Sequence, residues 1–154
     1  MSLNKKHNYS CILVCSNFQN QKSDTEISND LKEFESLAST LELDIIDSTV
    51  FSIRKFSSSS YYGRGQLESL KNKASLMECR YILFNDEISP SQFKNIQKVF
   101  GGKKIIFDRT GIILEIFKNN AKTKESKYQV ELASLQYILP RLTGQWTHLE
   151  RQMG

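Results

Sequence analysis

Four short apolar runs alternate with helix-like patterns as far as residue 120. The runs cover residues 10–15, 43–53, 81–84 and 104–107. Between them, apolar residues recur at the three- and four-residue spacing of amphipathic helices. Repeated strand–helix alternation is typical of a parallel sheet covered by helices. The pattern therefore predicts an α/β fold with a four-stranded parallel sheet and helices on both faces. Since right-handed crossovers leave few topologies, we expect the strand order 2-1-3-4.

Capping residues mark several helix ends. Ser23 precedes Glu26 by three residues, and Ser89 precedes Gln92 by three, which is the spacing of a capping box. Gly101 follows an amphipathic stretch and predicts the end of a helix there.

From Tyr128 onward, large apolar residues fall at alternating intervals of four and three. They are Tyr128, Leu132, Leu135, Leu139, Leu142, Trp146, Leu149 and Met153. This spacing is typical of a coiled-coil seam, although Pro140 should kink or restart the helix. A helix packed on the sheet would explain only the part up to Leu139. The seam therefore predicts a partner: a second coiled-coil helix, or a second copy of the chain in a helix-mediated homodimer.

The change of pattern predicts two parts. Residues 4–120 form the α/β domain. Residues 121–154 begin a helical coiled-coil subdomain, which we expect to be antiparallel and incomplete.

The net charge of +4 is unevenly distributed. Residues 1–100 contain 12 basic and 12 acidic side chains, whereas residues 101–154 contain 9 basic and 5 acidic ones. A surface that faces a polyanion is therefore expected at the C-terminal end, the alternative being a solvated lysine-rich helix. The three cysteines lack zinc-site spacing, and two histidines exclude a histidine-rich metal site.

No apolar stretch approaches the length of a membrane span, and no basic segment followed by an apolar one opens the chain. We expect a cytoplasmic protein without membrane contact.

A series of motifs from Tyr61 to the end resembles the N-terminal region of the HflX family of ribosome-associated GTPases. In order, they are Tyr61–Gly65 (YYGRG), Asp86–Gln92 (DEISPSQ), Asp108–Thr110 (DRT), Ile113–Phe117 (ILEIF), Gln129–Ala133 (QVELA), Pro140–Gly144 (PRLTG) and Trp146–Gln152 (WTHLERQ). The chain departs from the family pattern at Gln66, where Lys is usual, and at Asn85 and Ser126. It also has no G-x-x-x-x-G-K-[ST] phosphate-binding loop.

The resemblance implies a fragment that stops before the GTPase domain. Such a fragment is not an enzyme and has no cofactor, whereas the full-length parent hydrolyses GTP with Mg²⁺ in the missing domain. Family members bind the large ribosomal subunit, and some split stalled or stressed ribosomes. The implied partners are that subunit and its rRNA, the missing GTPase domain and the second coiled-coil helix.

Basic residues near the seam are the candidate ribosome and RNA contacts. They are Lys122, Lys124, Lys127, Arg141, His148 and Arg151. For the lysines, the alternative is an ordinary solvated surface. The Gly63-Arg64-Gly65 turn precedes a predicted helix and could bind an anion, or it could be only a structural turn.

Three carboxylates suggest another class of function. Asp86 and Glu87 follow the third predicted strand, and Asp108 follows the fourth. Doubly wound folds place ligands at this edge, so the alternative is a small magnesium-dependent, phosphate-handling enzyme. Helix capping would also explain these residues.

Overall fold

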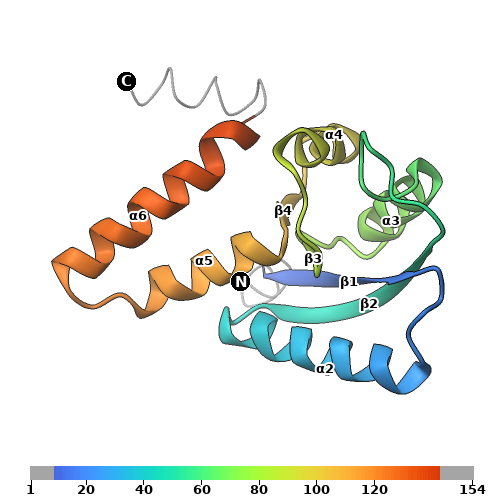
Figure 1. Cartoon of the computed structure of the whole chain (residues 1–154), viewed down its shortest axis with the longest axis horizontal. Coiled ribbons are helices and arrows are strands. Elements are labelled where there is room, and N and C mark those ends of the chain that lie inside the picture. The colour runs from blue at the N-terminus through green and yellow to red at the C-terminus, as the bar shows by residue number, and fades with distance from the viewer. Residues whose placement is uncertain (1–8, 143–154) are drawn as a thin grey trace.

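The structure is a computed structural model that describes residues 9–142, in which strands and helices alternate (Figure 1). In chain order, the elements are β1 (Ser10–Phe18), α2 (Asp24–Thr40), β2 (Asp44–Ile53), α3 (Arg64–Leu76), β3 (Tyr81–Phe84), α4 (Pro90–Phe100), β4 (Ile105–Phe107), α5 (Arg109–Asn120), α6 (Lys124–Ile138) and the 3₁₀ turn η1 (Leu139–Arg141). Within residues 9–142, no helix has the length and apolar content needed to cross a membrane.

The four strands form one parallel sheet in the order β2-β1-β3-β4. This confirms both the fold class and the strand order predicted from the sequence. Ile12 of β1 pairs with Ile82 of β3 at the centre of the sheet. On the other side of β1, the register shifts between Cys11 and Ile12, so β2 has a local irregularity near Ile46.

Helices cover both faces of the sheet, each over its own apolar cluster. Residues of α3 and α4 cover one face, including Leu67, Leu70, Phe93, Ile96 and Phe100. Residues of α2 and α5 cover the other, including Phe34, Ala38 and Ile112. The predicted helices on both faces are confirmed. Three free cysteines, Cys11, Cys15 and Cys79, are buried in these clusters.

The predicted caps are present. The side chain of Ser23 accepts a hydrogen bond from the Glu26 amide. Ser89 and Gln92 cap each other's amides at the start of α4. Gly101 ends α4 with φ of 63°, a left-handed conformation that glycine adopts without steric cost.

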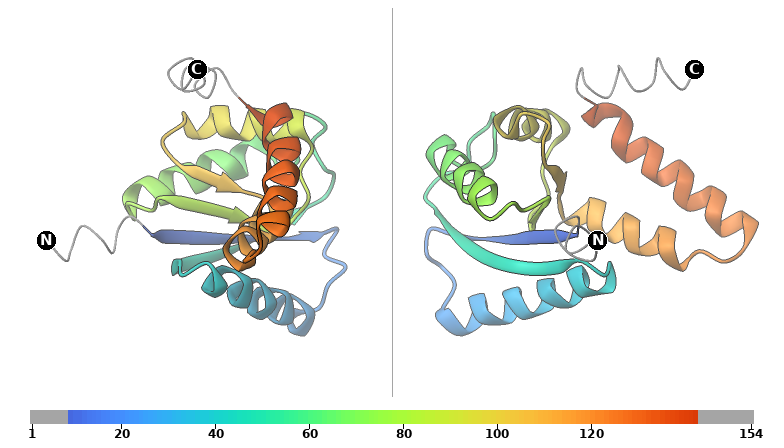
Figure 2. Two further views of the ribbon diagram at one scale, coloured as in Figure 1. Left: turned by 90° about the vertical axis from the view of Figure 1, so that its left-hand side faces the viewer. Right: turned by 180° about the vertical axis from the view of Figure 1, so that it is seen from behind.

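Helices α5 and α6 form a hairpin that projects away from the sheet (Figures 1 and 2). The two helices run in opposite directions, and the loop of residues 121–123 lies at the far end. Helix α6 ends at Ile138, before the 3₁₀ turn that contains Pro140. This agrees with the predicted interruption, because proline cannot continue the backbone hydrogen bonding of a helix.

Candidate functional site

The tip of the α5–α6 hairpin carries an exposed group of lysines. Lys118 lies in the last turn of α5, Lys122 in the loop, and Lys124 and Lys127 in the first turn of α6. None of the four forms an ion pair with another residue of the described part of the chain. Glu125 is the one acidic residue between positions 118 and 130. The tip is therefore locally positive and open to a ligand. Three of these lysines are among the candidate contacts named from the sequence, and the structure places Lys118 beside them.

Arg141 lies at the opposite end of α6 from the tip. It lies 17 positions beyond Lys124 in the sequence, about 25 Å at the rise of a helix. Its guanidinium donates hydrogen bonds to the carbonyl oxygens of Tyr137 (2.8 Å) and Ile88 (3.1 Å). The predicted phosphate contact of Arg141 stays a prediction, and the structure shows that much of its donor capacity is used within the chain. His148 and Arg151 lie outside the described residues.

The Gly63-Arg64-Gly65 turn begins α3. Gly63 occupies the N-cap position with φ of −61°, and its amide donates to the side-chain oxygen of Gln66 at 3.3 Å. A Cβ on Gly65 would meet no atom within 4 Å. Neither glycine is needed for a left-handed backbone or for close packing, and the Arg64 side chain is 83% exposed. The turn leaves its backbone accessible, while the predicted anion contact stays a prediction.

Asp86 lies beside β1 at the carboxyl edge of the sheet, where the chain crosses from one face to the other. Doubly wound folds often bind ligands at this switch point. Here its carboxylate oxygens accept hydrogen bonds from the hydroxyl groups of Ser16 (3.0 Å) and Tyr62 (2.8 Å). Burial, with the nearby Asp86 charge, raises the pKa of Tyr62 well above its usual value, so its phenol remains a donor.

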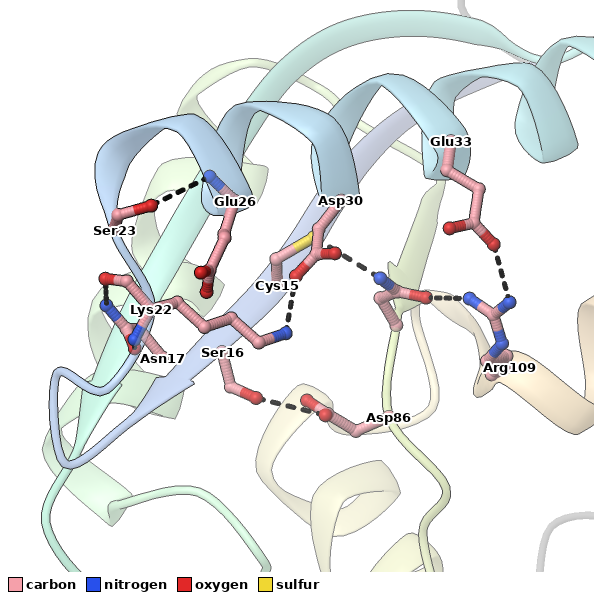
Figure 3. Close-up of polar contacts among 11 residues, drawn as sticks. Cys15, Ser16, Asn17, Lys22, Ser23, Glu26, Asp30, Glu33, Asp86 and Arg109 are labelled. Carbon is pink, nitrogen blue, oxygen red and sulfur yellow. Dashed lines mark hydrogen bonds and ion pairs between the residues drawn. The ribbon is translucent and has the colours of Figure 1, made fainter.

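Arg109 joins three elements at the same edge. Its guanidinium donates to the side-chain oxygen of Asn85 (2.6 Å) and to the carboxylate of Glu33 on α2 (2.8 Å). Figure 3 shows Arg109 and Glu33 facing each other across the edge, with Asp86 and Ser16 beside them. The polar groups at this edge are bound mainly to one another.

Asp108 is buried and serves as the N-cap of α5. The residue is 1% exposed, and its carboxylate accepts hydrogen bonds from the amides of Gly111 (2.9 Å) and Ile88 (3.2 Å) and from the hydroxyl of Tyr137. Within residues 9–142, no group of three or more His, Cys, Asp or Glu side chains could hold a metal ion. The contacts of Asp108 support the capping interpretation of this residue.

Helix α6 has a partly buried inner face and an exposed outer face. The inner face packs toward α5 and the sheet domain, and its partly buried residues are Ser126, Val130, Ala133, Ser134 and Tyr137. The outer face carries the predicted seam. Its described members up to η1, Tyr128, Leu132, Leu135 and Leu139, are 48% to 68% exposed. These four members of the seam therefore do not pack on the sheet.

Comparison with known proteins relates most of the chain to one group of GTPases. Residues 28–118 match the family described as GTP-binding GTPase N-terminal, and residues 120–154 match the GTP-binding GTPase Middle Region. The GTPase HflX of Alkalihalophilus pseudofirmus is 39% identical over 136 residues, which cover 88% of this chain and 32% of that protein. The GTPase HflX of Escherichia coli K12 is 37% identical over 126 residues, covering 81% and 29%. The chain thus spans about a third of the length of these relatives.

A solved structure shows the same fold. It is a GTP-binding protein from the hyperthermophilic archaeon Sulfolobus solfataricus in complex with GDP, with a TM-score of 0.65 and 24% identity over 86% of this chain and 37% of that chain. The family matches confirm the resemblance carried by the motifs from Tyr61 onward, and the chain belongs to the HflX family of GTPases as its N-terminal region.

Proposed function

We propose that this chain is the ribosome-binding region of a translational GTPase, and that the tip of its α5–α6 hairpin contacts the RNA of the large ribosomal subunit. The observation that carries the proposal is the group of exposed, unpaired lysines at the end of a projecting hairpin. Lysine binds phosphate as a point charge. Each phosphate that a lysine neutralises releases condensed counterions, which favours binding.

The hairpin shape supports this assignment. A pair of helices about 10 Å wide each can enter a space that the sheet domain cannot, and it carries the lysines at its far end (Figure 2). His148 and Arg151 stay candidate RNA contacts of the region that follows α6 in the sequence.

We also propose where the full-length parent protein binds and hydrolyses GTP. Relatives that carry the name GTPase are about three times as long as this chain, and the chain itself contains no phosphate-binding loop sequence. We expect GTP and Mg²⁺ to bind elsewhere in the parent, in the cytoplasm, with hydrolysis timing the splitting or rescue of stalled ribosomes. We expect no GTP hydrolysis by this region alone.

The outer face of α6 has its own proposed partner, which is a second helix of the parent protein packed along the seam. Tyr128, Leu132, Leu135 and Leu139 have coiled-coil spacing and are exposed. Covering each of the larger side chains would contribute roughly 1.5–3 kcal/mol. In the isolated chain, helix α6 of a second copy of the chain would pack along this outer face instead.

Co-sedimentation with purified large ribosomal subunits tests the RNA contact. Changing Lys122, Lys124 and Lys127 together to Ala should weaken binding and reduce the slope of log affinity against log salt by roughly 2 to 3. Lys32, Lys55 and Lys98 are also exposed but lie on the sheet domain, so their combined change to Ala is the matched control. Equal loss in both variants would mean that net charge, and not the hairpin tip, determines binding.

A further inference from the structure

The α5–α6 hairpin is attached to the sheet domain at two places. The first is covalent, because α5 directly follows β4 through Asp108. The second is the end of α6, which returns to the same region through Tyr137 and Arg141. A helix held at one end can pivot, whereas two attachments on different helices remove that freedom.

Asp108 belongs to both attachments. It caps α5 through the Gly111 amide, holds the β3–α4 loop through the Ile88 amide, and accepts the hydroxyl of Tyr137 from α6. Burial and the nearby Asp108 charge raise the pKa of Tyr137 well above its usual value, so the phenol stays protonated and donates. One buried carboxylate thus connects the sheet domain to both helices of the hairpin.

Arg141 adds a second set of contacts between the end of α6 and the sheet domain. Its guanidinium carbon lies 4.0 Å from the centre of the Tyr137 ring and 5.9 Å from that of Phe93 on α4. Its two terminal nitrogens donate to the carbonyl oxygens of Tyr137 and Ile88. Stacking combined with a forked pair of donors requires the planar guanidinium, which lysine cannot replace.

Gly111 brings α6 close enough for these contacts. A Cβ at this position would lie 2.9 Å from the Tyr137 hydroxyl oxygen and 3.1 Å from a ring carbon of Phe107. Its φ is not in the left-handed region, so the glycine serves the close approach of the Tyr137 side chain.

The geometry points to Tyr137 and Arg141 as positioning residues that fix the direction of the hairpin, so that its basic tip is presented to RNA at a constant angle to the sheet domain. The effect on RNA binding rests on the proposed function, whereas the anchoring rests only on the contacts described. This role differs from the phosphate contact predicted for Arg141 from the sequence.

Binding experiments separate the two roles of Arg141. If it positions the hairpin, R141A and R141K should both bind large ribosomal subunits roughly tenfold more weakly, with the salt slope unchanged. If it contacts phosphate, R141K should keep most of the affinity and R141A should lower the slope by about 0.7–0.9. Arg80 is exposed on the sheet domain, and R80A controls for the loss of one positive charge.

Distance measurements test the anchoring without RNA. Spin labels on N120C, at the end of α5, and E35C, on α2, would report the angle of the hairpin. Both positions are exposed, whereas Cys11, Cys15 and Cys79 are buried and should not react. The unaltered hairpin should give one narrow distance distribution, and R141A and Y137F should broaden it. Y137F keeps the ring beneath Arg141 and loses only the bond to Asp108, so it provides a test if R141A fails to fold.

The outcomes are distinguishable. Broadened distances with no ribosome binding by any variant would support the anchor and refute the proposed function. Narrow distributions in both variants, or recovery of binding by R141K, would overturn the positioning role of these residues.

Discussion

The buried phenol of Tyr62 donates a 2.8 Å hydrogen bond to the carboxylate of Asp86, at the switch point of the sheet. A ligand commonly occupies this place in doubly wound folds. Here the second Asp86 oxygen is bound by Ser16, so the chain satisfies the carboxylate with its own hydroxyl groups. The switch point therefore stabilises the fold through contacts within the chain.

Changing Tyr62 to Phe should therefore destabilise the fold. The Phe ring keeps the stacking on Phe84, whose centroid lies 4.9 Å away, but Asp86 loses one of its donors. We expect the free energy of unfolding to fall by about 1–3 kcal/mol, measured by urea denaturation. Y128F removes a hydroxyl from an exposed tyrosine and should change stability by less than about 0.5 kcal/mol. Equal effects of the two changes would show that the Tyr62–Asp86 bond contributes nothing.

Stability should decrease as the pH rises above about 9. Burial raises the pKa of Cys11 from 9.0 to about 12 and that of Cys15 to about 11. Between the unfolded and folded pKa values, the unfolded thiols lose protons that the folded thiols keep. The folded state then binds more protons, so the free energy of unfolding falls with pH.

Urea denaturation from about pH 8 to about pH 9.5 would measure this decline, since unfolded tyrosines, with a pKa of 10.0, still keep most of their protons there. The double variant C11A/C15A should show a flatter dependence. A slope identical to that of the natural sequence would contradict the assignment to these thiols.

Replacing Gly111 or Gly65 with alanine should change the free energy of unfolding in opposite directions. A Cβ at Gly111 meets the Tyr137 hydroxyl oxygen at 2.9 Å, and the Tyr137 side chain is held in place by Asp108 and Arg141. G111A should lower the free energy of unfolding by about 1–3 kcal/mol. Gly65 lies in the first turn of α3 with open space around it, so G65A should raise it by about 0.4–1 kcal/mol. Thermal unfolding of the two variants measures both changes in stability. A G111A variant that is more stable than the natural sequence would show that α6 does not pack as closely as described.

Local signals predicted the fold well because they act over a few residues. Ser89 and Gln92 are three residues apart, and Gly101 ends its own helix, so each cap could be read directly from the sequence. The strand order followed from the alternation of elements and the handedness of their connections.

Contacts between distant residues were not predictable in this way. Arg141 and Ile88 are 53 residues apart in the chain, and no spacing rule relates them. The inner face of α6 was also missed, because the leucines of the outer face give a stronger periodic signal than Val130 and Tyr137 do. For the candidate site, the sequence located the basic residues of the hairpin tip, but not the hairpin that presents them.

The outer face of α6 should make the isolated chain associate with itself. Leu132 and Leu135 are 58% and 48% exposed, and covering them in a helix pair would remove apolar surface from water. We expect the sedimentation coefficient to rise with concentration in analytical ultracentrifugation. L132E/L135E should stay monomeric without losing stability, since neither side chain packs against the sheet domain. Leu76 on α3 is 86% exposed but stands outside the seam, so L76E is the matched control and should associate like the natural sequence. A chain that remains monomeric at every concentration would refute pairing through this face between copies.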